Sequence, residues 1–238
     1  MITTLKTLAG VLVLASLTST QAVDITGKVS LKGTPPAEKD LPLDPACGKL
    51  WANEKPKTRF YVVGAESGLG DALVYLKKFD GKVQDPAKAA LLDQKGCEYS
   101  PYVLGVQTGQ KILIRNSDPV LHNVHGTPKL NKEFNLAQMA GGKDIERSLD
   151  QPEVIVRFKC DVHPWMFAYI GVLPHPYFAV TDKDGKFKIE GVPAGKYTLV
   201  AFHRKAHGTE EKAVAQEITV ADSAVSANFT VEVPPPAQ

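Results

Sequence analysis

Three side chains that can bind a soft metal stand in one short segment, "RFKCDVHPWMFAYIGV" (157–172). Cys160, His163 and Met166 follow one another at intervals of three residues, before an apolar run typical of a strand. One thiolate, two imidazoles and a weak axial thioether are the ligands of a type 1 copper site, a set suited to cycling between Cu(I) and Cu(II). The segment supplies three of these ligands and predicts a second histidine on another strand.

An upstream segment supplies that histidine. "YSPYVLGVQTGQKILIRNSDPVLHNVHG" (99–126) predicts a pair of strands followed by His122. His125, on the same strand, is an alternative ligand. Zinc is a competing metal because it also takes cysteine and histidine ligands, but a thioether ligand favours copper. We therefore expect one copper ion per chain, bound by His122, Cys160, His163 and Met166.

In these residues the chain resembles the cupredoxins, and most closely the amicyanins, which combine a compact CxxHPxM ligand loop with an upstream HNVH; plastocyanins are similar but have a longer loop. The resemblance covers residues 99–173 and implies a Greek-key β-sandwich with the four ligands named above. It favours His122 over His125, and it implies that Asn123 joins the two ligand-bearing segments through hydrogen bonds. Val162 departs from the pattern, because amicyanin has proline there.

The elements that must position these ligands are mostly strands. β-branched or alternating runs occur throughout the chain, among them 25–31, 59–64, 72–77, 102–107, 111–116, 122–126, 153–158 and 167–173. Only "PAKAALLDQ" (86–94) has the spacing of a short helix. The pattern predicts an all-β protein.

A second module is expected after "LPHPY" (173–177), where two prolines interrupt the strand pattern. "TDKDGKFKIEGVPAGKYTLVAFH" (181–203) resembles the carboxypeptidase regulatory-like, or transthyretin-like, β-sandwich. Too few strands follow residue 177 for a sandwich of about seven, so 25–31 and 72–77 are candidates to complete it. The expected division is a signal peptide (1–22), a cupredoxin-like copper domain with an N-terminal extension (23–173), the smaller sandwich (174–233) and a disordered tail (234–238).

The N-terminus has the features of a secretory signal peptide. A basic start and the apolar run "LAGVLVLASL" (8–17) precede a small-residue cleavage site at Ala22, and no second apolar run follows. We expect a periplasmic or secreted protein without a membrane span in the mature chain. Because export leads to an oxidising compartment, Cys47 and Cys97 are expected to form a disulfide, with two buried free thiols as the alternative.

The net charge indicates no particular class of binding partner. The leader holds one of the 28 basic residues, Lys6, so the mature chain has a net charge of +1, and no basic run with interleaved aromatic residues indicates nucleic-acid binding. No nucleophile, P-loop or dinucleotide motif indicates an enzyme. The leading hypothesis is a one-electron carrier between redox proteins such as a c-type cytochrome or a dehydrogenase. Copper storage or delivery, and a structural or surface-attachment role, are the alternatives.

Overall fold

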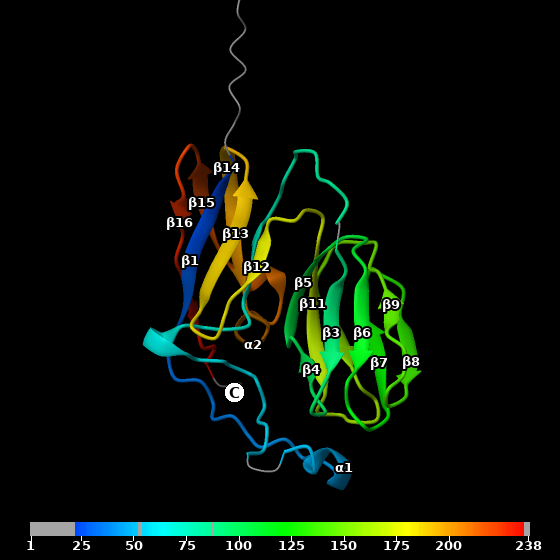
Figure 1. The fold of residues 1–238 in the computed structure, drawn as a ribbon. Coiled ribbons are helices and arrows are strands. Elements are labelled where there is room, and N and C mark those ends of the chain that lie inside the picture. Colours follow the sequence, from blue (N-terminus) through cyan, green and yellow to red (C-terminus); the bar gives the residue numbers. More distant parts are fainter. Residues whose placement is uncertain (1–21, 52–53, 87, 236–238) are drawn as a thin grey trace, which may run out of the picture.

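The computed structural model describes residues 22–51, 54–86 and 88–235. Two β-sandwiches lie side by side, which confirms the all-β prediction (Figure 1). The signal peptide predicted at 1–22 lies outside the described residues except for Ala22, as do the last three residues of the predicted tail. Among the residues described, no helix is both long and apolar enough to cross a membrane.

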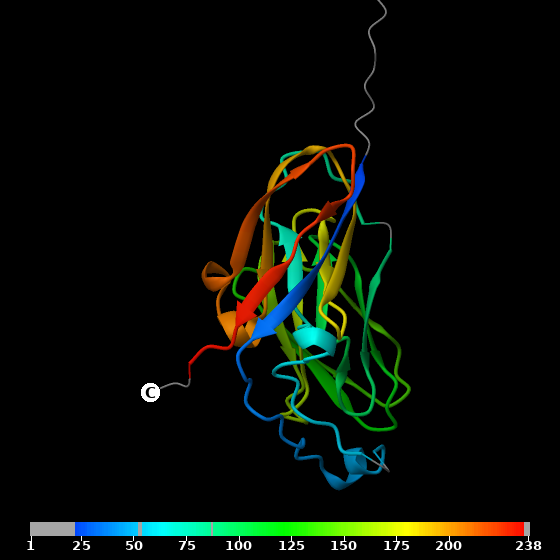
Figure 2. The same cartoon turned by 90° about the vertical axis from the view of Figure 1, so that its left-hand side faces the viewer.

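The first sandwich contains both ends of the described chain. One sheet has the order β13-β1-β16 with β17 also paired to β1, and the other has the order β12-β2-β14-β15. Figure 2 shows β1 beside β17, with which it pairs in parallel. The bounds are β1 Val23–Lys32, β2 Leu73–Leu76, β12 Phe178–Val180, β13 Lys186–Val192, β14 Gly195–Phe202, β15 Val214–Val220, β16 Val225–Ser226 and β17 Phe229–Glu232.

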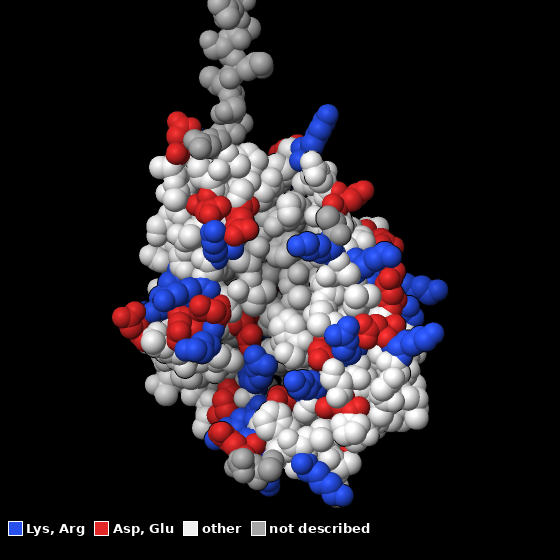
Figure 3. Space-filling model, in the orientation of Figure 1, with Lys and Arg blue, Asp and Glu red and all other residues white. Residues whose placement is uncertain are grey.

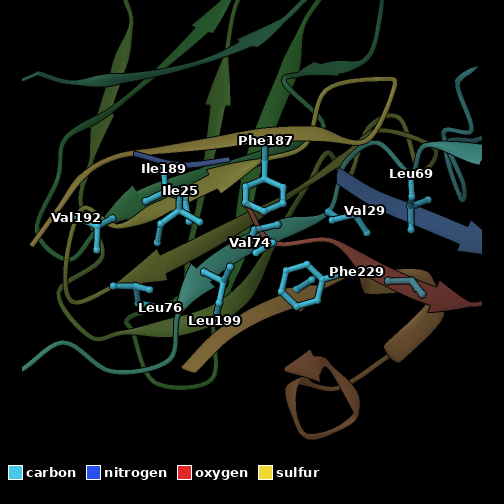
Figure 4. Close-up of a cluster of buried hydrophobic side chains, with 14 of the residues drawn as sticks. Ile25, Val29, Leu69, Val74, Leu76, Phe187, Ile189, Val192, Leu199 and Phe229 are labelled. Atoms are coloured by element: carbon cyan, nitrogen blue, oxygen red, sulfur yellow. The ribbon is translucent and has the colours of Figure 1, made fainter. Parts of the chain in front are cut away.

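The expectation that two N-terminal strands complete this sandwich is confirmed. β1 pairs with β13, and β2 lies between β12 and β14. The division at residue 173 is corrected for these two strands, because their apolar side chains are needed to close the core of this sandwich. Figure 4 shows Ile25 and Val29 from β1 in one cluster with Val74 and Leu76 from β2 and with Phe187.

The second sandwich carries the predicted ligands. Its sheets have the orders β5-β11-β10-β7-β8 and β4-β3-β6-β9. Its core includes the three cysteines and Met166. The bounds are β3 Ala90–Gln94, β4 Tyr99–Ser100, β5 Val103–Gln107, β6 Ile112–Asn116, β7 His122–Thr127, β8 Phe134–Gln138, β9 Ile145–Arg147, β10 Glu153–Lys159 and β11 Phe167–Leu173.

Two local predictions were wrong. The segment expected to be helical (86–94) contains β3, which pairs in parallel with β6 and buries Leu92 in the core. Tertiary pairing has overridden a weak helical preference. The run 59–64 forms no strand and makes only an isolated bridge, between Val63 and Leu69.

A long arm, described at residues 33–51 and 54–61, leaves β1 and reaches the second sandwich. Its two limbs are joined by backbone hydrogen bonds from Leu41 to Pro56 and from Thr58 to Lys39. At its far end α1 (Pro45–Gly48) lies beyond the lower end of the second sandwich in Figures 1 and 2. The other helical turns are η1 (Ala65–Ser67), α2 (Arg204–His207) and η2 (Glu210–Lys212).

Candidate metal centre

Two neighbouring strands and one loop bring the predicted ligands together. His122 is the first residue of β7, and Cys160 directly follows β10, the partner of β7 in the sheet. The loop 160–166 then turns back into β11. It is closed by hydrogen bonds from the Cys160 amide to the Met166 carbonyl (3.0 Å) and from the Met166 amide to the His163 carbonyl (2.9 Å). The spacing of three residues therefore corresponds to one tight turn.

Three donor atoms converge in this turn. The Nδ1 atoms of His122 and His163 are 2.9 Å apart, and Nδ1 of His163 is 3.6 Å from Sγ of Cys160. All three side chains are buried, and one donor atom from each lies within 4.8 Å of the other two. Metal bonds of about 2.0 Å to nitrogen and about 2.3 Å to sulfur place donors roughly 3 to 4 Å apart, so these residues fit a single shared ion.

Met166 is buried at the end of the same loop, with 1% of its surface exposed. It belongs to the apolar cluster that contains Cys160. The structure thus places the thioether residue in the same buried region as the thiol, as the ligand prediction requires. Copper takes a weak axial thioether in this role.

Asn123 joins the two ligand-bearing segments, as expected. Its side-chain Oδ1 accepts hydrogen bonds from the amides of Asp161 (2.7 Å) and Val162 (3.3 Å). Its own amide N–H points at Sγ of Cys160 at 3.5 Å. β7 and the ligand loop are therefore held in a fixed relation, and the sulfur has a donor that stabilises its thiolate form.

Electrostatics favour the ionised thiol. Burial opposes ionisation, but hydrogen bonds from His122 and from the amides of Asn123 and His163 outweigh it and hold the pKa of Cys160 below its usual range. Burial also disfavours the charged form of His122, yet its contacts with Asp118 and Cys160 raise its pKa. Burial and the nearby His122 lower the pKa of His163. A metal ion binds a thiolate and neutral imidazoles. Binding would therefore displace any further proton on the histidine rings.

His125 is engaged elsewhere. Its Nδ1 is 2.7 Å from Asp161 and its Nε2 is 2.7 Å from Glu133, so both ring nitrogens have carboxylate partners. It belongs to none of the clusters of donor atoms found among the described residues. Of the two histidines left open by the sequence, the geometry therefore supports His122.

The disulfide between Cys47 and Cys97 is present, as predicted, with 5.8 Å between the Cα atoms. Its sulfur atoms adjoin the centre, because Cys47 and Cys97 lie within 4.8 Å of a ring nitrogen of His163, and Cys97 is equally close to Asp118 and His122. Sequence reasoning missed Asp44 and Asp118. Asp44 before Pro45 is a recognisable helix N-cap signal, but no local pattern indicates which histidine it faces.

Comparisons with known proteins come from solved structures. No family model matches the chain, and no curated protein matches it. A purple cupredoxin from Nitrosopumilus maritimus is similar, with 22% identity over 35% of this chain and 98% of its own, at a TM-score of 0.30. A Cu(I) structure of an amicyanin mutant has 16% identity over 42% of this chain and 97% of its own, at a TM-score of 0.32.

A copper-containing nitrite reductase from Thermus scotoductus SA-01 is also similar, with 18% identity over 41% of this chain and a TM-score of 0.33. This chain covers 25% of that enzyme's length. The two cupredoxin neighbours, in contrast, are covered almost completely, while most of this chain lies outside each match.

Proposed function

We propose that this chain is an exported copper protein that carries single electrons between redox proteins. His122, Cys160 and His163 would hold one copper ion, with Met166 as the axial ligand. The observation that carries the proposal is the convergence of the Cys160 thiol and the His163 imidazole, from one turn, with the His122 imidazole at the start of β7, all three buried. When bound, copper supplies one-electron chemistry between Cu(I) and Cu(II).

The residues of this chain keep the centre rigid. Cys160 and His122 are fixed at the ends of two paired strands, and the loop between Cys160 and Met166 is closed by backbone hydrogen bonds. Asn123 then ties the loop to β7. Donors held in this way need little movement when the charge of the ion changes, which suits a carrier.

The burial of the donor residues favours an electron carrier over an enzyme. His122, Cys160 and His163 are 0%, 1% and 4% exposed. The cavity beside Met166 and Trp165 has a volume of about 20 Å³, which is room for about one water molecule. Electrons can reach such a buried centre through packed protein, which suits a carrier.

The partner would dock near the ligand loop, over exposed apolar residues. Leu121, next to His122, is 40% exposed, and Val162 in the ligand loop is 49% exposed. Pro119 and Pro164 are exposed beside them in the sequence. A small apolar contact suits a transient encounter. Trp165 and Phe167 also follow His163 in the sequence, but both are partly buried, and the Trp165 indole donates to the Cys97 carbonyl at 3.1 Å.

Charge would contribute little to docking. Lys and Arg side chains are interspersed with Asp and Glu on the face shown in Figure 3. A c-type cytochrome or a dehydrogenase is therefore proposed as a partner through apolar contact. The first sandwich would act as a carboxypeptidase regulatory-like module for spacing or docking.

Copper storage is the second candidate function, and the burial of all three donors favours it because closed ligands slow the release of an ion. Loading the purified mature protein with Cu(II) separates the two functions. A carrier shows an intense sulfur-to-copper charge-transfer band and a reversible potential, and the matched Cys160→Ser variant shows neither. A protein that retains only Cu(I), without a reversible couple, contradicts electron carriage and supports storage.

A further inference from the structure

Each of the two histidines has a carboxylate on the ring nitrogen that faces away from the centre. Nε2 of His122 is 2.9 Å from Asp118 Oδ2, and Nε2 of His163 is 3.2 Å from Asp44 Oδ2. Because an ionised carboxylate only accepts hydrogen bonds, each carboxylate favours a proton on the Nε2 that faces it. The two Nδ1 atoms face each other on the inner side at 2.9 Å, where one proton would bridge them until a metal ion displaces it.

Asp44 reaches His163 from the arm, at the N-cap of α1. Its Oδ1 accepts the Cys47 amide N–H at 2.8 Å, which leaves Oδ2 for the histidine. Asp44 is the N-cap of the four-residue α1, which fixes this carboxylate at the far end of the arm.

Asp118 is buried, with 5% of its surface exposed. Its Oδ1 accepts the Gly96 amide at 2.6 Å, and its Oδ2 accepts the Cys97 amide at 2.7 Å. Two backbone amides and the His122 ring therefore fix this carboxylate beside His122.

The Cys47–Cys97 disulfide links these two carboxylates. Cys47 donates its amide to Asp44 and Cys97 donates its amide to Asp118, while the two sulfur atoms are bonded to each other. Trp51 and Trp165 fix the Cys97 side of the link, because their indoles donate to the carbonyls of Gly96 (2.7 Å) and Cys97 (3.1 Å). The contacts form a continuous chain from one histidine to the other that passes through the disulfide.

We propose that Asp44 and Asp118 are positioning residues for His163 and His122, and that the Cys47–Cys97 disulfide keeps both carboxylates in place. The inference rests on the proposed copper site. A carboxylate on the outer nitrogen fixes the tautomer and the ring orientation and makes the imidazole a stronger donor. Two such anions stabilise Cu(II) more than Cu(I), so they lower the reduction potential of the centre.

Asp44→Ser is the informative variant, because serine also serves as an N-cap but is too short to bond His163 as well. Asp40→Asn is the matched control. Asp40 is exposed on the same arm, and its substitution removes one negative charge, as Asp44→Ser does. We expect Asp44→Ser to weaken Cu(II) binding about tenfold relative to Cu(I), which raises the potential by about 59 mV. Asp118→Asn should act in the same direction.

The disulfide is tested with the Cys47→Ser/Cys97→Ser double variant, with circular dichroism to show that it is folded. It should raise the potential at least as far as Asp44→Ser does, because it frees the arm. A potential that stays within the shift caused by Asp40→Asn, in both the double variant and Asp44→Ser, overturns the proposal.

A readout without copper separates this inference from the proposed function. Histidine ¹⁵N NMR of the metal-free protein should show neutral His163 with its proton on Nε2, and a mixture of tautomers in Asp44→Ser. The same tautomer distribution in both proteins overturns the positioning role. Absence of Cu(II) binding by the wild-type protein contradicts the proposed function alone, and the NMR comparison still decides the role of Asp44.

Discussion

Gly105 of β5 and Gly171 of β11 are paired in register. Because neither has a side chain, side chains of the first sandwich pack directly against both. A Cβ on Gly105 would lie 2.6 Å from the ring of Phe178, and one on Gly171 would lie 2.5 Å from the Leu73 side chain. Phe178 and Leu73 belong to the first sandwich. The position of β11, which directly follows Met166, is therefore tied to the packing of that sandwich.

Replacement of these glycines should loosen the contact between the sandwiches. Gly105→Val and Gly171→Val each force side chains into occupied space, and we expect a loss of about 1 to 3 kcal/mol in the free energy of unfolding. Urea unfolding measures it. Gly48→Ala is the control, because nothing lies within 4 Å of its added Cβ. Equal losses in the control and in the two valine variants would contradict this account of the interface.

The identity of the upstream ligand can be tested with two histidine variants. His122→Ala removes a donor atom and should weaken copper binding by more than about 100-fold, whereas outer contacts are worth about 10- to 100-fold. His125→Ala should cost less, because its ring bonds Asp161 and Glu133 instead. Competition with a chelator of known affinity gives both values. The reverse order would move the ligand to His125.

The two sulfur ligands should differ in their effects. Cys160→Ala should abolish the charge-transfer band, because the thiolate is the donor from which the band arises. Met166→Leu should keep the band and shift the potential, since a weak axial ligand tunes the couple without creating the colour. Visible spectra and electrochemistry distinguish the two. A Cys160→Ala protein that remains blue would disprove the ligand assignment.

The ligand loop was predictable from the sequence because a CxxHxxM segment is local, and a single turn with one strand on each side is enough to place its side chains. The disulfide was predicted from the expected oxidising compartment and from the number of cysteines. Asp44 was not predictable, because its contact with His163 depends on the arm that crosses from one sandwich to the other. The helix prediction for 86–94 was wrong for a related reason. The parallel pairing of this segment with β6 is a tertiary effect that overrides its local helical spacing.

The docking surface can be tested at Val162. Val162→Lys places a charge on an exposed side chain of the ligand loop and should slow electron exchange with a small exported cytochrome about tenfold, with an unchanged visible spectrum. Stopped-flow mixing measures the rate. Val83→Lys is the control, since Val83 is 42% exposed and lies outside the ligand-bearing segments. If both variants exchange electrons at the wild-type rate, the partner docks elsewhere.

Trp165 should behave differently from Val162. Its indole bonds the Cys97 carbonyl, and its ring centroid lies 5.2 Å from that of His163. Trp165→Glu should therefore disturb the copper spectrum as well as the exchange rate. A variant with slow exchange and an unaltered spectrum would show that Trp165 contributes to the docking surface after all.

Acid should destabilise the first sandwich through His203. This side chain is buried, stacks on Tyr61 and accepts the Ala206 amide through Nδ1, so the folded protein holds it neutral. Burial, with the nearby His207 and Arg204, lowers its pKa to about 3. The unfolded chain takes up this proton near pH 6.5. The stability that His203 contributes is therefore complete above about pH 6.5 and is lost as the pH falls towards 3.

The loss should be about 1.4 kcal/mol for each pH unit below about 6.5, or about 2 kcal/mol at pH 5. His203→Asn keeps an N-cap acceptor for Ala206 but does not titrate, so its unfolding free energy should fall less than that of the wild type between pH 6.5 and 5. His125→Asn is the matched control. The carboxylate partners of His125 raise its pKa. Replacing His125 should therefore not reduce the fall in unfolding free energy between pH 6.5 and 5. Urea unfolding of the metal-free proteins measures the difference, and equal losses in His203→Asn and the wild type would show that His203 is protonated without unfolding.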